Sequence, residues 1–169
     1  HQCLAANVIT EVQGIVNGTT NFMLTKMVRE GLGFDDALKI AQELGYAETK
    51  DPSDDVDGRD ACRKIAILTS LVCGQQVDFE DIHTEGITKI TAADFEYANA
   101  AEYTIKLLGR SRAIDDDTAE VMVAPFMLPK DHPLAMVYGV FNAVFVTGNM
   151  LGDSMYYGRG AGKLPTASA

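Results

Sequence analysis

The sequence predicts an α+β fold in which helices pack on one face of a mixed, largely antiparallel sheet. The expected order of elements is one strand, three helices, a short strand, a further helix and then several strands. Strands that follow one another so closely have to pair mostly antiparallel, because a parallel pair needs a crossover of about a dozen residues or more. The length of 169 residues and the hydrophobic content of 47% fit one globular domain with a real core.

The first third of the chain predicts a strand followed by two helices. Residues 7–16 are rich in β-branched side chains and predict the strand. Thr19 or Thr20 is expected to cap the first helix, whose first-turn amides either form a plain N-cap or suit a carboxylate. The second helix is expected to begin at Phe34 and to have Gly45 as its C-cap. Its core side is expected to carry Ala37, Ile40, Ala41 and Leu44.

A third helix, expected over residues 57–73, carries the first chemical signal. Asp60 and Lys64 lie in one row beside its core face, and their i, i+4 spacing lets them form an ion pair. A lysine on the apolar side of a helix loses solvation, which lowers its pKa and makes it a usable proton donor near neutral pH. The alternative is an ordinary intrahelical salt bridge. The row also contains Ile67 and Leu71, and the core face contains Ala61, Ile65, Leu68 and Val72.

The loop before this helix is rich in carboxylates, namely Glu48, Asp51, Asp54, Asp55 and Asp57. Part of it resembles a calcium loop. However, Ser53 and Lys64 occupy the first and twelfth positions, where such loops need acids, so we expect no calcium site. A divalent ion held by Asp51, Asp54 and Asp55 is the alternative to a solvated loop without metal.

The second half of the chain predicts one long helix and several strands. A short strand is expected at residues 83–87, and Thr91 is expected to cap an amphipathic helix that continues to Gly109. One helical turn is expected over residues 134–138, and His132 is expected to be exposed in the loop before it. The core of the long helix would contain Phe95, Ala98, Ala101, Tyr103 and Leu107. The remaining strands are expected at residues 110–114, 119–127, 140–147 and 154–157.

Composition excludes several classes of partner. The net charge of −10 argues against nucleic acid and anionic membrane surfaces, and it permits a cationic ligand. The uncharged run 134–152 is interrupted by asparagine and threonine, so it predicts two buried strands and a turn rather than a membrane helix. Cys3, Cys62 and Cys73 lack metal-ligand spacing, and the last two lie too far apart on one helix to bridge. Buried free thiols in a reducing, cytoplasmic environment are therefore expected.

The uncovered face of the sheet predicts self-association. Helices on one face leave the other face apolar and open unless it pairs with another copy of the chain. Because the last strands are uncharged, we expect them to form a sheet-on-sheet homodimer.

Four stretches resemble the homoserine dehydrogenase family: GIVNGTTNFML (14–24), LGYAETKDPSDDVDGRDACRKIAIL (44–68), GITKITAADFEYANAAEYTIKLLG (86–109) and GRGAGKLPTASA (158–169). The resemblance implies an enzyme that interconverts L-homoserine and L-aspartate 4-semialdehyde with NADP or NAD, in threonine and methionine biosynthesis. It implies that residues 1–157 bind substrate and dimerise, and that 158–169 lead back to a nucleotide-binding domain outside this sequence. The segment alone would then be inactive. The competing interpretation is a non-catalytic dimerisation or regulatory module of another dehydrogenase.

The resemblance also implies roles for single residues. Lys64 matches the lysine that gives a proton to the aldehyde oxygen as hydride arrives, and Asp60 matches its partner, which reaches the substrate hydroxyl. Glu48 matches the acid that holds the substrate ammonium group. The family often has one residue fewer between this acid and the following Asp-Pro, which makes Asp51 the alternative. Gly162 matches a glycine beside the cofactor. Substrate contacts are further implied for Gly18, Thr19, Tyr46 and Asp55.

Overall fold

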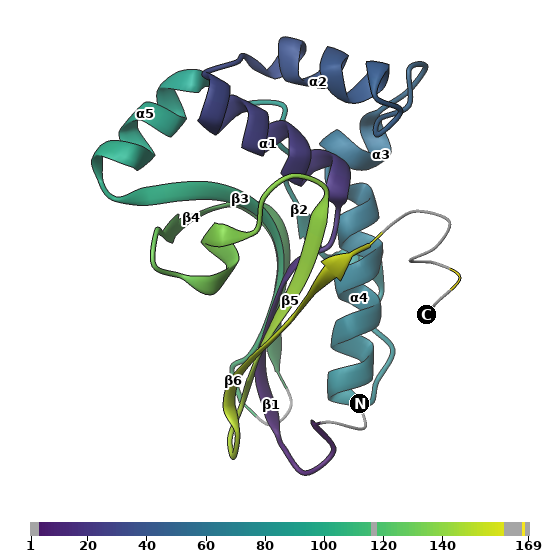
Figure 1. Cartoon of the computed structure of the whole chain (residues 1–169). Helices are drawn as coiled ribbons and strands as arrows, with labels where there is room; N and C mark the ends of the chain where they lie inside the picture. The colour runs from purple at the N-terminus through teal and green to yellow at the C-terminus, as the bar shows by residue number, and fades with distance from the viewer. Residues whose placement is uncertain (1–3, 116–117, 161–166, 168–169) are drawn as a thin grey trace.

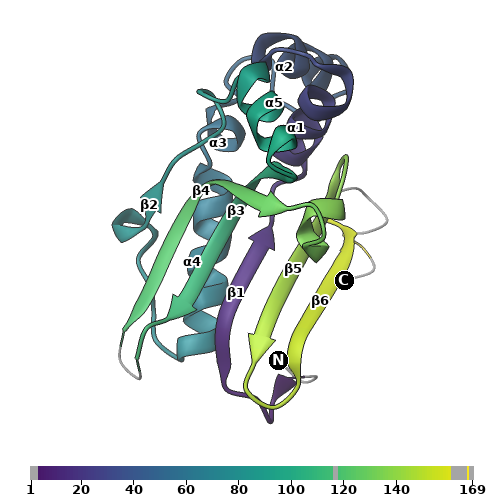
Figure 2. The same cartoon turned by 90° about the vertical axis from the view of Figure 1, so that its left-hand side faces the viewer.

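The computed structural model of the protein describes residues 4–115, 118–160 and 167. Its strands form one six-stranded sheet in the order β2-β4-β3-β1-β5-β6 (Figure 2). Among these described strands, only β2 and β4 pair parallel, so the predicted α+β class with a largely antiparallel sheet is confirmed. The strands are β1 (Ile9–Ile15), β2 (His83–Thr84), β3 (Tyr103–Ala113), β4 (Ala119–Pro129), β5 (Phe141–Gly148) and β6 (Gly152–Arg159).

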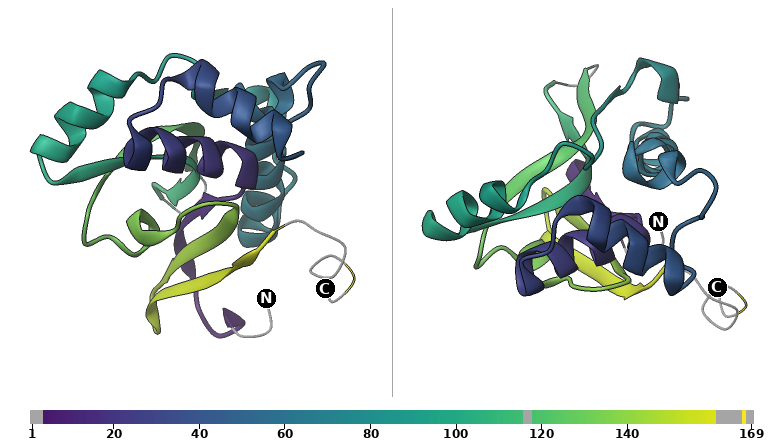
Figure 3. Two further views of the ribbon diagram at one scale, coloured as in Figure 1. Left: turned by 45° about the horizontal axis from the view of Figure 1, so that its top comes forward. Right: turned by 90° about the horizontal axis from the view of Figure 1, so that it is seen from above.

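Helices cover one face of this sheet and one of its ends. The helices are α1 (Gly18–Glu30), α2 (Phe34–Glu43), α3 (Ser53–Val56), α4 (Arg59–Cys73) and α5 (Ala92–Ala100), with 3₁₀ turns η2 (Phe79–Asp81) and η3 (Pro133–Met136). α4 lies along the face, whereas α1, α2 and α5 gather beyond the end of the strands (Figure 1, Figure 3). The turn η3 lies on the face opposite α4 (Figure 2). The end of the sheet is therefore where α1, α3 and the start of α4 come together.

α4 packs closely on β3 because small residues meet at the contact. A Cβ atom at Gly109 of β3 would lie 2.9 Å from the Cβ atom of Ile65, so glycine lets the helix approach the strand. The buried face of α4 carries Ala61, Cys62, Ile65, Ala66 and Thr69. Val72, which the sequence places on this face, is 40% exposed instead, because it lines a cavity at the end of the helix.

The largest departure from the sequence prediction is β3. The helix expected to continue to Gly109 ends at Ala100, and the chain continues as a strand. Glu102, with φ of +60°, has the left-handed backbone conformation and separates the two elements. The middle of β3 is buried on both faces, so it lacks the alternation of polar and apolar residues that marks a half-buried strand. Thr91 caps α5 as predicted, in a capping box.

The ends of the first two helices also correct the prediction. Asn17, and neither Thr19 nor Thr20, is the N-cap of α1, because its side chain accepts a hydrogen bond from the backbone N–H of Thr20. Leu44, expected in the core, is the C-cap of α2 and is 56% exposed. Gly45 follows it with a positive φ of 74°.

Two expectations about polar and thiol side chains are also corrected. His132 is half-buried rather than exposed, because its Nδ1 accepts a hydrogen bond from the backbone N–H of Leu134 at 3.2 Å. Cys62 is a buried free thiol as predicted, whereas Cys73 at the end of α4 is an exposed one. Cys3 lies outside the described residues.

The uncharged run 134–152 contains one strand rather than the two expected. Most of η3 and all of β5 lie within it, and β6 begins only at its last residue. β5 is an inner strand of the sheet, between β1 and β6. In the described part of the chain, no helix is long and apolar enough to cross a membrane.

Candidate active site

The candidate site lies where the first turns of α1 and α4 meet the acid-rich loop. Asn17, which the sequence did not mark as a site residue, connects these three parts. Its Nδ2 donates to Asp55 Oδ1 at 2.7 Å and to Asp60 Oδ2 at 2.9 Å, while its Oδ1 accepts from the Thr20 backbone at 2.8 Å. Because Asn17 is buried, this one amide fixes both carboxylates against the start of α1. Its position directly before a helix was the available signal, since asparagine is a preferred N-cap.

Lys64 and Asp60 form the predicted ion pair. Lys64 Nζ lies 2.7 Å from Asp60 Oδ2 and donates a second hydrogen bond to the backbone carbonyl of Val16 at 3.0 Å. The predicted desolvation of this lysine is wrong, because 47% of its side chain is exposed. The neighbouring apolar residues of the row do not cover it, since Ile67 and Leu71 are themselves exposed. The ammonium is thus oriented by two acceptors and open to a ligand.

The loop after α2 forms a second wall of the site. Thr19 Oγ1 donates a hydrogen bond to the backbone carbonyl of Tyr46 at 2.8 Å, and the Tyr46 ring packs edge-on against Phe22 with 4.9 Å between ring centroids. Gly18 at the start of α1 faces the chain before β5, because a Cβ atom there would lie 2.9 Å from the carbonyl oxygen of Val140. Three of the predicted substrate contacts therefore lie together at the first turn of α1.

The two rival acids of the loop differ in their surroundings. Asp51 Oδ1 accepts a hydrogen bond from the backbone N–H of Ser53 at 3.0 Å, and the hydrogen bonds from Ser53 lower the pKa of the Asp51 carboxyl. Glu48 is exposed, and its carboxylate has no hydrogen-bond partner among the described residues. Its backbone carbonyl is held instead, by Gln42 Nε2 at 3.0 Å. Asp51 already serves the start of α3, so Glu48 is the acid available for a ligand cation.

Arginines of α4 neutralise the other acids of the loop. Arg63 pairs with Asp54 and Arg59 pairs with Asp57, each at 3.2 Å. These pairs are exposed and contribute little to stability individually. Among the described residues, no group of three or more His, Cys, Asp and Glu side chains is arranged to hold a metal ion.

A second asparagine that the sequence did not mark, Asn142, joins the site from β5. Its Nδ2 donates to the carbonyl of Val16 at 3.2 Å, the same oxygen that accepts from Lys64. Its Oδ1 is buried without a partner among the described residues. A Cβ atom at Gly160 would lie 2.1 Å from Asn142 Nδ2, so the chain leaving β6 passes directly over this amide. Gly162, the glycine implied to lie beside a cofactor, falls outside the described residues.

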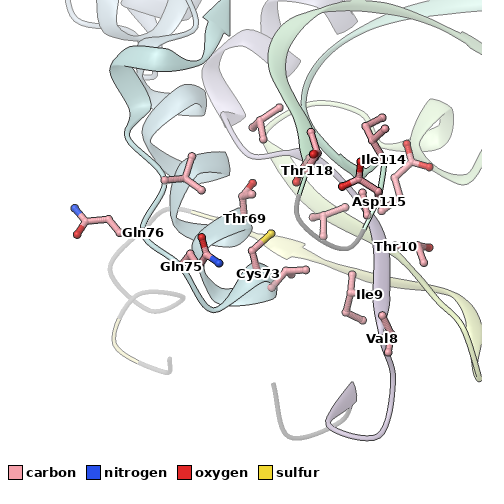
Figure 4. A pocket seen from close by; sticks show the side chains of 18 residues that line it. Val8, Ile9, Thr10, Thr69, Cys73, Gln75, Gln76, Ile114, Asp115 and Thr118 are labelled. Atoms are coloured by element: carbon pink, nitrogen blue, oxygen red, sulfur yellow. The ribbon is translucent and has the colours of Figure 1, made fainter.

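A cavity at the far end of α4 does not coincide with this site. It measures about 640 Å³ and lies at the C-terminal end of α4, between that helix, the start of β1 and the β3–β4 hairpin (Figure 4). Thr69, Cys73 and Ile114 are among its lining residues. Asp60 lies near the opposite end of the same helix, roughly 20 Å away at 1.5 Å per residue. The hydrogen-bonded cluster, and not the cavity, therefore defines the candidate site.

The comparison with known families decides the assignment. The family model described as Homoserine dehydrogenase matches residues 1–169. This chain belongs to the homoserine dehydrogenase family. It is 51% identical to the homoserine dehydrogenase of Synechocystis over 99% of this chain, and 48% identical to that of Bacillus subtilis over 98%.

Solved homoserine dehydrogenases have the same fold. The crystal structure from Thiobacillus denitrificans matches with a TM-score of 0.95 at 46% identity, over 99% of this chain and 38% of that one. A hyperthermophilic archaeal homoserine dehydrogenase in complex with NADPH matches with a TM-score of 0.79 at 34% identity, over 98% of this chain and 46% of that one. The chain spans 39% of the length of the Synechocystis relative and 38% of the Bacillus relative.

Proposed function

We propose that the full-length protein containing this chain is a homoserine dehydrogenase, which interconverts L-homoserine and L-aspartate 4-semialdehyde with NADP or NAD. In this proposal the chain supplies the substrate site and the acid–base group. The observation that carries it is the cluster in which Asn17 holds Asp55 and Asp60, while Asp60 holds Lys64. Family membership supports the same reaction.

Lys64 is proposed as the general acid of aldehyde reduction. Hydride arrival at the aldehyde carbon leaves an alkoxide, and an ammonium within hydrogen-bond reach supplies the proton it needs. Asp60 at 2.7 Å and the Val16 carbonyl at 3.0 Å orient two of the three Nζ protons, which leaves the third for the substrate oxygen. In the oxidation of L-homoserine, the neutral amine takes the proton back.

The charged groups of an amino-acid substrate have matching partners in the site. The Glu48 carboxylate is exposed and unpaired among the described residues, so it is proposed to bind the substrate ammonium group. The backbone N–H groups of Gly18 and Thr19 at the first turn of α1 are proposed to bind the substrate carboxylate, because a helix N-terminus favours an anion. Tyr46 and Asp55 complete the proposed substrate contacts.

The nicotinamide cofactor supplies the hydride and is proposed to be bound mainly by parts of the protein outside this chain. The sequence carries no G-x-G-x-x-G turn of the kind that binds a dinucleotide between a strand and a helix. Residues 158–169 are proposed to lead toward that domain, with residues 1–157 as the substrate-binding and dimerisation domain. Gly162 is proposed to lie against the cofactor.

Replacing Lys64 tests the proposed reaction. In the full-length protein, Lys64→Ala is expected to lower turnover of L-homoserine by about a thousandfold, because general acid–base catalysis is lost. Cofactor affinity, measured by fluorescence titration, is expected to stay within twofold. Arg63→Ala is the matched control, since Arg63 is the adjacent, half-exposed cation of the same helix. Near-normal turnover of Lys64→Ala would remove Lys64 from the mechanism.

The alternative function is a non-catalytic dimerisation or regulatory module of another dehydrogenase. Such a module would not lose ligand binding when Glu48 or Asp60 is neutralised, whereas a substrate site would.

The face of the sheet opposite α4 supports the proposed homodimer. Tyr157 of β6 pairs with Ala143, which packs in a cluster with Leu134 of η3 on that face. Tyr157 remains 55% exposed, and Met155 beside it is exposed as well. Tyr157→Arg is expected to shift the full-length protein toward monomer in light scattering, whereas Tyr97→Arg on α5 is expected not to. An unchanged mass for Tyr157→Arg would place the interface elsewhere.

A further inference from the structure

A second lysine, Lys106 of β3, is buried without a carboxylate partner. Its exposed fraction is 2%, and it forms no ion pair with any described acid. Burial, and to a smaller degree the charge of Arg29, lower the pKa of Lys106 to about 8. A buried unpaired charge is costly, so the contacts that its nitrogen makes are the place to look for a role.

The ammonium of Lys106 binds the chain that follows η3. Its Nζ donates to the carbonyl of Val137 and, at 3.2 Å, to Asn21 Oδ1 of α1. It also lies 4.5 Å from the ring centroid of Tyr138, whose ring has the Arg29 guanidinium 4.0 Å away. The charged or titratable groups that act on Lys106 are Arg29 of α1 and Tyr138 of this segment. The cross-strand neighbour of Lys106 on β4 is the apolar Phe126.

Asn21 continues the contact from the other side. Its Nδ2 donates to the carbonyls of Val137, Gly139 and Phe141 at 3.2, 3.0 and 3.1 Å. Lys106 accounts for the amide oxygen, so the orientation of the Asn21 amide is fixed by the lysine. Thr25, one turn further along α1, accepts from the backbone N–H of Gly139 at 2.9 Å. The segment 137–142 is thereby fastened to α1 at several backbone groups.

The same segment reaches the candidate active site. The carbonyl oxygen of Val140 lies 2.9 Å from where a Cβ atom of Gly18 would be. Asn142, at its end, donates to the Val16 carbonyl at 3.2 Å, and that oxygen also accepts from Lys64 at 3.0 Å. A continuous series of contacts thus joins the buried lysine to the exposed one.

We propose that Lys106 and Asn21 form a buried clamp that sets the segment 137–142 against α1 and thereby positions the Val16 carbonyl that orients Lys64. Lys106 touches no reacting atom and is a positioning residue. The effect of the clamp on catalysis rests on the proposed function, whereas its effect on the mobility of the segment 137–142 does not.

The test uses the full-length protein with Lys106→Met, an unbranched apolar replacement without donors. Lys130→Met is the matched control, because Lys130 follows β4, is exposed and pairs with Glu102 at 3.2 Å. Lys106→Met is expected to have a Tm at neutral pH no lower than wild type, since it removes a buried unpaired charge. Its kcat for L-homoserine oxidation is nevertheless expected to fall at least tenfold, with KM changed by less than threefold. A merely structural lysine would leave kcat within twofold in the folded variant, and that result overturns the proposal.

Hydrogen exchange separates this proposal from the proposed function. Amide exchange within the segment 137–142 is expected to become at least tenfold faster in Lys106→Met and to stay unchanged in Lys130→Met. If wild-type protein does not oxidise L-homoserine, the proposed function fails, and the clamp is then tested by hydrogen exchange alone. If Lys106→Met does not fold, Asn21→Leu is the second variant, because it removes the three hydrogen bonds from the other member of the clamp to the segment 137–142. Unchanged exchange in the segment, in either variant, overturns the clamp.

Discussion

Two lysines lie on adjoining elements of this chain and differ in both exposure and pairing. Lys64 of α4 is half-exposed and has a carboxylate partner at 2.7 Å. Lys106 of β3 is fully buried, its hydrogen-bond acceptors are neutral, and the Tyr138 ring and the Arg29 guanidinium lie near it. The contrast shows that pairing and burial are separate properties of a cation. The exposed, paired lysine is suited to exchange a proton with a ligand, and the buried one is suited to hold backbone in place.

The largest expected effect breaks the pairing of the exposed lysine. Asp60→Ala in the full-length protein removes one acceptor from Lys64 and one from Asn17. Turnover of L-homoserine, measured by the appearance of reduced cofactor, is expected to fall about a thousandfold. Asp57→Ala is the control, because the ion pair of Asp57 with Arg59 is exposed and does not touch Lys64. If turnover falls equally in the two variants, the acids of this region act through their summed negative charge rather than through a contact with Lys64.

The next effect concerns the buried lysine and pH. Burial lowers the pKa of Lys106 from 10.5 to about 8, so between these two values the unfolded chain binds more protons than the folded one. The free energy of unfolding of the wild type should therefore rise with pH relative to Lys106→Met. The total rise is on the order of 3 kcal/mol and is complete only above the unfolded pKa. Urea unfolding near pH 7 and near pH 10 measures most of this rise, because pH 10 still lies below the unfolded pKa of 10.5.

Lys130→Met provides the control for this titration. It removes an exposed lysine that pairs with Glu102, and so separates the effect of burial from the loss of a lysine as such. If the difference in unfolding free energy between wild type and Lys106→Met is instead the same at both pH values, Lys106 is not desolvated as its burial implies. The contrast between the two lysines is then lost.

A third change tests the contact between α4, which carries Lys64, and β3, which carries Lys106. Gly109 lies three residues after Lys106 on β3, and Ile65 follows Lys64 on α4. A Cβ atom at Gly109 would lie 2.9 Å from that of Ile65, so Gly109→Ala should push the helix from the strand and cost about 2 kcal/mol of unfolding free energy. Gly158→Ala is the control, because nothing lies within 4 Å of its added atom. Similar urea midpoints for both variants would show that α4 shifts without strain.

The sequence predicted the pairing of Lys64 with Asp60, though not the exposure of Lys64, and it missed the buried lysine, for physical reasons. Asp60 and Lys64 are four residues apart on an amphipathic helix, and both the pairing and the helix are local patterns. Lys106 lies in a strand that is covered on both faces, so periodicity there resembled a continued helix. Its partners come from α1 and from the chain after η3, and contacts over such sequence separations leave no local signal.

The same distinction applies to the two asparagines of the site. Asn17 was predictable as a helix N-cap, because the preference for asparagine there is a property of the helix end. Its bonds to Asp55 and Asp60 were not predictable, because they depend on how α1, α3 and α4 meet. Asn142 lies 126 residues from the Val16 carbonyl it binds. Its role follows only from the sheet that places β1 beside β5.

The smallest expected effect is on substrate affinity and decides between the two rival acids. L-Homoserine added to this chain is expected to produce saturable amide shifts in NMR spectra around Thr19, Tyr46 and Lys64. Glu48→Gln should weaken that binding about tenfold, because it removes the charged partner of the substrate ammonium group. Asp51→Asn should leave it nearly unchanged, since Asp51 is engaged with Ser53.

Each outcome of this titration locates the substrate site differently. A loss of binding in Asp51→Asn with normal binding in Glu48→Gln would transfer the ammonium contact to Asp51. Shifts that survive both changes would place the ammonium group away from the loop. If wild-type chain shows no saturable shifts, the hydrogen-bonded cluster around Asn17 is preformed but does not bind substrate alone. The exposure of Lys64 would then be explained as a surface that the rest of the protein has to cover before L-homoserine binds.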